Sequence, residues 1–132
     1  MAKTRKSVAR DPRPAVAIGH VEHHVADVGK SAKFLEALGV RPIMRQRNFA
    51  VMEVRGGTHI ILAKAKGKID KGAAAPFDLI VDDVDEMRAA CVKLRLKPSR
   101  MSRGSIHDWF EILDPSGYEL TILSSHAGNR PV

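Results

Sequence analysis

At 132 residues, with 44% hydrophobic and 28% charged residues, the chain has the size and composition of one globular domain. A single cysteine excludes an internal disulfide framework. Because the chain has no secretory signal and no apolar run near the about 20 residues that span a bilayer, we expect a cytoplasmic protein without a membrane partner. The formal net charge of +7 would suit nucleic acid, but basic residues are scattered and aromatic residues make up 5%, so nucleic-acid binding is not expected.

The first half of the chain predicts a strand, a helix and three short strands. Residues 1–14 are basic and contain two prolines, and we expect a disordered tail there. A single domain is expected over 15–125, opening with an alternating strand over 15–25. Asp27 is placed to cap a helix that Gly39 would end. The three strands are expected near 41–46, 49–55 and 58–64, with Gly56 and Gly57 joining the last two.

The second half repeats this order after a linker over 66–75 that is rich in glycine, lysine and alanine. A strand is expected over 77–81, and Asp83 and Glu86 have the spacing of a capping box for the helix that follows. Further strands are expected near 97–101, 107–113 and 118–124, before a C-terminal tail over 126–132. Both modules, 15–65 and 76–125, therefore read βαβββ.

An internal repeat supports the two modules. The run Val25-Ala26-Asp27-Val28 is echoed 56 residues later by Val81-Asp82-Asp83-Val84. We predict an α+β fold in which two tandem βαβββ modules form a curved mixed sheet around a cleft. A site would lie between the two copies, on their facing sheets.

Strand alternation selects the side chains that would face this cleft. On the first strand, Val21 and Val25 mark the face that packs on the helix. His23 shares that face, so we expect it to be buried and hydrogen-bonded to backbone. The residues expected to face the cleft are His20, Glu22, His24, His59, Ile61, Pro76, Asp78, His107, Trp109, Glu111, Glu119 and Thr121.

Two runs carry a resemblance to a known superfamily. The first is His20-Val21-Glu22-His23-His24-Val25-Ala26-Asp27-Val28, and the second is Phe110-Glu111-Ile112-Leu113-Asp114-Pro115-Ser116-Gly117-Tyr118. They resemble the first and second modules of vicinal oxygen chelate proteins, which include glyoxalases, bleomycin-resistance proteins and extradiol dioxygenases. The resemblance covers about residues 16–125 and implies a homodimer, since members commonly pair.

The resemblance also bears on metal binding. In the superfamily's enzymes a divalent metal is held by up to four side chains, one from the first and last strand of each module. The matching positions here are His20, Ile61, Pro76 and Thr121. Only His20 is a usual ligand, and a metal site generally needs three or more protein donors, so we expect no cofactor. An enzyme would need Zn, Ni, Mn or Fe held at a displaced site, for example by His20 with Glu22, Glu111 or His107.

These observations lead to two functional hypotheses. The first is a glyoxalase- or bleomycin-resistance-like protein that binds a small molecule in the cleft without the full metal site. Its ligand-binding residues would be His20, Glu22, His24, Phe49, His59, His107, Trp109 and Thr121. The alternative is an enzyme: a metal-dependent lyase, isomerase or dioxygenase with displaced ligands, or a metal-free acid–base catalyst. Its catalytic residues would be His20, Glu111 and Glu119, because imidazole and carboxylate groups suit proton transfer near neutral pH.

Overall fold

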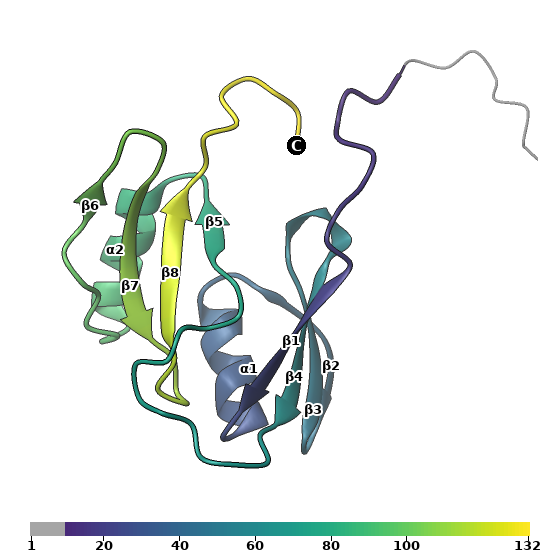
Figure 1. The fold of residues 1–132 in the computed structure, drawn as a ribbon, viewed down its shortest axis with the longest axis vertical. Helices are drawn as coiled ribbons and strands as arrows, with labels where there is room; N and C mark the ends of the chain where they lie inside the picture. The colour runs from purple at the N-terminus through teal and green to yellow at the C-terminus, as the bar shows by residue number, and fades with distance from the viewer. Residues whose placement is uncertain (1–9) are drawn as a thin grey trace, which may run out of the picture.

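The computed structural model describes residues 10–132 and contains the two expected modules (Figure 1). The first module consists of β1 (His20–Val25), α1 (Val28–Ala37), β2 (Arg41–Gln46), β3 (Phe49–Glu53), a 3-10 turn (Arg55–Gly57) and β4 (His59–Lys64). The second consists of β5 (Leu79–Val81), α2 (Val84–Lys93), β6 (Ser102–Arg103), β7 (Asp108–Leu113) and β8 (Glu119–Ser124). The predicted α+β fold of two tandem βαβββ modules is confirmed. Of the tail expected over 1–14, residues 1–9 lie outside the described part of the chain.

Each module forms its own four-stranded sheet. The strand orders are β1-β4-β3-β2 and β5-β8-β7-β6, and the first and last strands of each module run parallel. In Figure 1 the sheets lie side by side, with β1 and β5 at the edges nearest each other. No hydrogen-bond ladder joins these two edges in the described part of the chain, so the sheets are not closed into one curved sheet.

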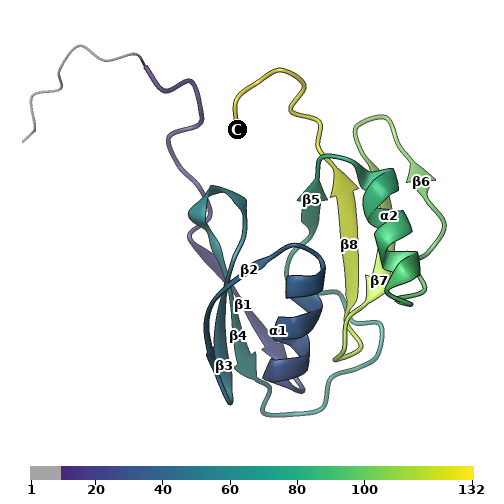
Figure 2. The same cartoon turned by 180° about the vertical axis from the view of Figure 1, so that it is seen from behind.

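The two helices begin where their sequences predict. The Asp27 carboxylate accepts a hydrogen bond from the Lys30 amide at 3.0 Å, and the Asp83 carboxylate accepts one from the Glu86 amide at 2.9 Å. Each bond satisfies an amide that the first helical turn leaves unpaired. Gly39, with φ of 107°, follows the end of α1, where a side chain would be strained. Seen from behind, both helices lie in front of the sheets (Figure 2).

Alternate strand residues and the apolar faces of the helices form the core. The fully buried strand side chains are Val25, Ala50, Met52 and Leu62 in the first module and Phe110, Ile112, Leu120 and Ile122 in the second. Each large side chain buried this way contributes about 1.5–3 kcal/mol. The opposite face of each sheet carries no helix from the described residues, and its side chains are exposed or half-buried.

Two strand predictions are wrong in extent. The first strand begins at His20 instead of 15, and residues 15–19 are exposed and form no strand. The strand expected near 97–101 is absent, and the short β6 follows it at 102–103. Arg95 and Lys97 have φ of 60° and 51°, in the left-handed region, and Pro98 has no amide hydrogen to donate. The Ser99 amide still donates to the Glu111 carbonyl of β7 at 2.9 Å.

The linker packs on the second module, and an exposed ion pair is one of the contacts that join the two modules. The linker expected over 66–75 packs on the second module: Gly72 donates to the Gly117 carbonyl at 2.7 Å, and Ala75 donates to the Glu119 carbonyl at 2.9 Å. Arg55 makes a bidentate ion pair with Asp82 at 3.0 and 3.1 Å. Among residues 10–132, no helix has the length and apolar character needed to cross a membrane.

Candidate binding site on the open sheet faces

The open face of the first sheet carries the first three predicted site residues. His20, Glu22 and His24 are exposed along β1, while Val21 is half-buried and His23 and Val25 are buried on the other face. This alternation is the one the sequence predicts. His24 and Glu22 lie 3.8 Å apart, nitrogen to oxygen, but both side chains are more than half exposed, so their attraction is weak.

A row of four polar residues crosses this sheet at one register. His20 pairs with His59 between β1 and β4, His59 pairs with Glu53 between β4 and β3, and Glu53 pairs with Arg41 between β3 and β2. Residues directly opposite on neighbouring strands have side chains close enough to interact. Four residues from positions 20 to 59 therefore form one polar row on the open face.

Glu53 is the centre of this row. Its carboxylate accepts hydrogen bonds from the Arg41 guanidinium, one of them from Nε at 2.9 Å, and it lies 3.5 Å from His59 Nε2. Its side chain is 19% exposed, against 75% for Arg41. The Glu53 carboxylate therefore lies between a guanidinium and an imidazole. His59 is the register partner of His20 on the neighbouring strand.

The registers beyond the polar row are apolar on β4 and β3. Ile61 pairs with Val51, and Ala63 pairs with Phe49, whose side chain is 37% exposed. The open face of the first sheet thus combines a polar end, able to donate and accept hydrogen bonds, with an apolar strip that ends at an aromatic ring. This combination is typical of surfaces that bind small organic molecules.

The open face of the second sheet carries the remaining predicted residues. Glu111 pairs with Thr121 between β7 and β8, and Trp109 lies one alternation further along β7. Glu111 accepts a hydrogen bond from the Ser99 hydroxyl at 3.1 Å. Glu119, at the start of β8, is exposed. His107 precedes β7 and donates through Nδ1 to the Ser124 carbonyl at 2.7 Å, so its ring is held at the end of the sheet.

The structure does not bring the three predicted catalytic residues into contact. No ion pair within 4 Å joins His20 to Glu111 or Glu119 in the described residues. His20 has His59 as its register partner instead, and Glu111 is bonded to Ser99. Among the carboxylates of the open face, Glu22 lies two residues along β1 from His20, and Glu53 lies two strands away across His59.

His23 is buried, as predicted, but its partner differs from the expected one. Its Nε2 donates to the Asp114 carboxylate at 2.9 Å, and the two side chains are 3% and 4% exposed. The prediction of a backbone partner was wrong. Strand alternation predicts which face of the sheet His23 occupies, but it does not predict which loop packs against that face. Asp114 arrives from the β7–β8 turn of the other module.

Comparison with known structures identifies the fold. No protein-family model matches the chain, and no curated protein matches its sequence. Oxidase ChaP-H2 is similar, with a TM-score of 0.70 and 19% identity over 85% of this chain and 95% of that chain. The lactoylglutathione lyase from Agrobacterium tumefaciens is similar with a TM-score of 0.69 and 17% identity, over 89% of this chain and 99% of that chain.

A third structure is named for the superfamily itself. A member of the glyoxalase/bleomycin resistance protein/dioxygenase superfamily from Sphaerobacter thermophilus has a TM-score of 0.68 and 16% identity, over 83% of this chain and 98% of that chain. The chain has the vicinal oxygen chelate fold. The resemblance read from the sequence is thereby confirmed at the level of fold.

The metal positions of the vicinal oxygen chelate fold do not have a fitting donor set here. His20 lies on the open face, but Ile61 supplies no donor atom, Pro76 supplies no side-chain donor, and the Thr121 hydroxyl is a poor ligand. Within residues 10–132, no three His, Cys, Asp or Glu side chains converge as metal ligands. The displaced site suggested around His20 with Glu22, Glu111 or His107 is therefore not assembled in this structure.

Sequence reasoning missed two residues of the polar row. Glu53 and Arg41 were not among the predicted site residues. Phe49 was among them, and Glu53 lies four residues further along the same strand, so alternation places both side chains on one face. This alternation could have identified Glu53 from the sequence. Arg41 enters only through the β2–β3 register, which no local pattern specifies.

Proposed function

We propose that this protein binds a small organic molecule on its open sheet faces, without the usual metal ligand set of its fold. The observation that carries the proposal is the polar row of His20, His59, Glu53 and Arg41 beside the apolar strip that ends at Phe49. A planar apolar body would lie on Phe49 and Val51. Its polar edge would bond to the imidazoles of His20 and His59.

The second sheet face would complete the site. Trp109 offers a flat aromatic surface for stacking, and Glu111 and Thr121 offer oxygen atoms beside it. His24, Glu22 and His107 would lie at the margins, where exposed side chains add specificity more than affinity. The glyoxalase and oxidase names of the similar structures describe those proteins, and for this chain they support only the choice of a small-molecule ligand.

Trp109 is the only tryptophan and gives a direct assay. A library of planar phenols, aromatic amines and aromatic carboxylates should contain compounds that change Trp109 fluorescence saturably. His20→Ala and Phe49→Ala should weaken such binding about tenfold, and Val92→Ala, a smaller truncation on the exposed side of α2, should not. Binding that survives both open-face variants would contradict the proposal.

One contact favours a second candidate function, a metal-free acid–base enzyme. His59 Nε2 lies 3.5 Å from the Glu53 carboxylate, and a histidine with a carboxylate partner can act as a general base near neutral pH. Turnover of a bound ligand that disappears in Glu53→Gln while binding persists would select the enzyme. Unchanged ligand after prolonged incubation would select the binding protein.

A metal-dependent enzyme would be recognised by its metal content. Elemental mass spectrometry should be performed before and after loading with Mn, Fe, Ni and Zn. About one tightly held ion per chain, lost in His20→Ala, would contradict the conclusion that the chain lacks a fitting set of metal ligands. Protein that stays metal-free after loading would support it.

We also propose that the protein forms a homodimer through its open faces. Met44 on the first sheet and Ile80 and Leu113 on the second are 40–53% exposed, on faces that no helix of residues 10–132 covers. Light scattering should give twice the chain mass of 14.5 kDa. A mass of one chain at micromolar concentration would contradict this part of the proposal.

A further inference from the structure

A hollow on the other side of the second module has the composition of an anion-binding site. It lies between α2 and β6, has a volume of about 450 Å³, and is lined by Asp85, Arg88, Ala89, Arg100, Met101 and Arg103. Three of the six residues are arginines. The volume lies within the range of about 300–1,000 Å³ that is usual for small-molecule sites.

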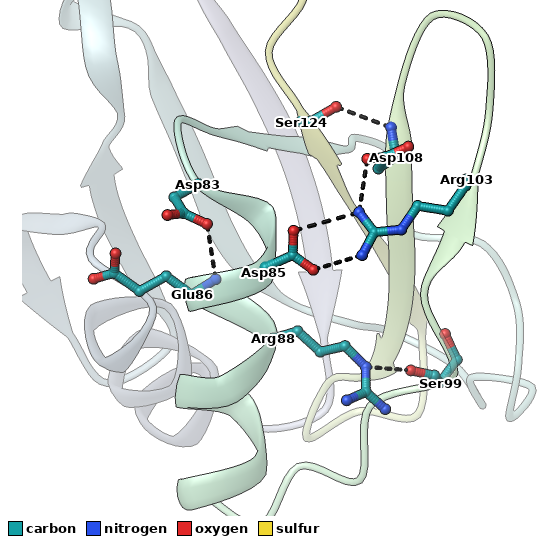
Figure 3. Close-up of polar contacts among 8 residues, drawn as sticks. All are labelled: Asp83, Asp85, Glu86, Arg88, Ser99, Arg103, Asp108 and Ser124. Atoms are coloured by element: carbon teal, nitrogen blue, oxygen red, sulfur yellow. Dashed lines mark hydrogen bonds and ion pairs between the residues drawn. The ribbon is translucent and has the colours of Figure 1, made fainter.

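Arg103 forms a fixed wall of this hollow. Its guanidinium donates to the Asp85 carboxylate at 2.8 and 3.3 Å and to the Asp108 carboxylate at 2.8 Å (Figure 3). These hydrogen bonds raise the pKa of Arg103 and lower the pKa of Asp85 below 3.8. Asp85 is therefore ionised and committed to Arg103. It does not neutralise the other two arginines.

Arg88 is oriented by backbone, and its charge is not neutralised by a carboxylate. Its Nε donates to the Ser99 carbonyl at 2.8 Å, which leaves the Nη1 hydrogens available (Figure 3). No carboxylate lies within 4 Å of the Arg88 or Arg100 guanidinium among residues 10–132. Two arginines, one on a helix and one in a loop, therefore line the hollow without a carboxylate partner among the described residues.

We propose that this hollow binds the phosphate group of a small organic phosphate. Two guanidinium forks supply donors for the three terminal oxygens of a phosphate. Three arginines against the carboxylates of Asp85 and Asp108 leave the surroundings of the hollow with one net positive charge, which favours an anion. Ala89 and Met101 give the hollow an apolar part that an organic body would cover. The site is separate from the open sheet faces, because α2 packs on the opposite face of β7 and β8.

Phenyl phosphate and inorganic phosphate are suitable probes. Titration at constant ionic strength, followed by amide NMR, should shift the Ala89 and Met101 signals saturably. Phenyl phosphate should bind with a dissociation constant of about 1 mM or lower, and about threefold or more tightly than inorganic phosphate, since it covers the apolar part. Benzoate carries a carboxylate in place of the phosphate group, and phenol carries no charged group. Both should bind more weakly than phenyl phosphate.

Arg100→Gln should raise the dissociation constant of phenyl phosphate about fivefold or more, because one of the two unneutralised guanidinium groups is lost. Arg88→Lys, which keeps the charge but loses the fork, should raise it about threefold or more. Arg47→Gln is the matched control: it removes the same charge from an exposed turn of the first module and should leave binding unchanged.

Three results would overturn the proposal. They are shifts that stay linear with phosphate concentration, an effect of Arg47→Gln equal to that of Arg100→Gln, and a benzoate affinity at or above that of phenyl phosphate. Arg100 is exposed and makes no side-chain ion pair, so its variant should fold normally, as the amide spectrum will verify. His20→Ala and Phe49→Ala should leave this binding intact, which separates it from the function proposed for the open faces.

Discussion

His23 and Asp114 join the two modules through one buried hydrogen bond of 2.9 Å. They are separated by 91 residues in sequence, and each side chain is nearly inaccessible to solvent. The other oxygen of Asp114 accepts hydrogen bonds from the Ser116 and Tyr118 amides at 2.8 and 2.9 Å. The imidazole also packs against the rings of Phe77 and Tyr118, with centroids 5.2 and 4.7 Å away. One carboxylate thus shapes the β7–β8 turn and holds it against β1.

Asp114→Ala should lower the free energy of unfolding by about 1–3 kcal/mol, because it leaves a buried imidazole N–H and two turn amides unsatisfied. Asp114→Asn should cost less, since its amide oxygen can still accept from the turn amides. Chemical denaturation measures both variants. Equal costs for the two substitutions would mean that the bond to His23, and not the turn, accounts for the whole effect.

Ser31 is expected to be a site where stability can be gained. Its hydroxyl is buried without a hydrogen-bond partner among residues 10–132, and a cavity of about 10 Å³ lies between it, His23 and Phe77. Ser31→Ala removes an unsatisfied polar group from the helix interior and should raise the free energy of unfolding by about 1 kcal/mol. A lower melting temperature would contradict this expectation and would indicate that the hydroxyl is hydrogen-bonded in solution.

Gly104 should be intolerant of any side chain. A Cβ there would lie 2.6 Å from the His107 carbonyl oxygen and 2.8 Å from the Trp109 ring. Gly104→Ala should therefore destabilise the protein by about 1–3 kcal/mol and alter the near-ultraviolet circular dichroism of Trp109. The matched control is Gly67→Ala, where nothing lies within 4 Å of the new Cβ, and it should leave both signals unchanged.

The Asp85 carboxyl should titrate below its ordinary value. Hydrogen bonds from Arg103 lower the pKa of Asp85 from 3.8, so the ionised form is favoured in the folded protein. The stabilisation of the folded protein by ionised Asp85 is fully present above the pKa that Asp85 has in the unfolded chain. It is lost as the pH falls through the lowered pKa that Asp85 has in the folded protein.

Carboxyl carbon NMR from about pH 6 to about pH 2 should show the low midpoint of Asp85, and Arg103→Gln should move it upward. Asp11, whose pKa is lowered to about 2 by Arg13, should be unaffected and serves as the internal reference. A midpoint of Asp85 that does not respond to Arg103→Gln would contradict the assigned cause.

Cys91 should be unreactive in the native protein. Its thiol is fully buried in α2, and burial raises the pKa of this thiol above its ordinary value. Because the thiolate is the nucleophile, an aromatic disulfide reagent should modify Cys91 only after unfolding. Rapid modification of folded protein would contradict the core position of Cys91, which is the only cysteine.

The sequence by itself determined which face of each strand is buried. Alternation in 20–25 separated His20 and His24 from Val25, and the runs opened by Asp27 and Asp83 predicted the helix starts, because capping and alternation depend on residues a few positions apart. The βαβββ repeat followed from the same local signals. The short β6 was missed because the backbone near 95–98 adopts conformations that its residue types rarely adopt.

Only the tertiary structure decided which residues meet. The row of His20, His59, Glu53 and Arg41 depends on three strand registers, and the partner of His23 lies 91 residues away. Arg88 and Arg100 border one hollow because β6 returns beside α2. Strand registers and turn positions are fixed by packing of the whole core and by backbone hydrogen bonds between distant segments. A local sequence pattern does not specify which distant segments pair. The buried and open faces of the strands could therefore be predicted from the sequence, and the contacts between residues on neighbouring strands could not.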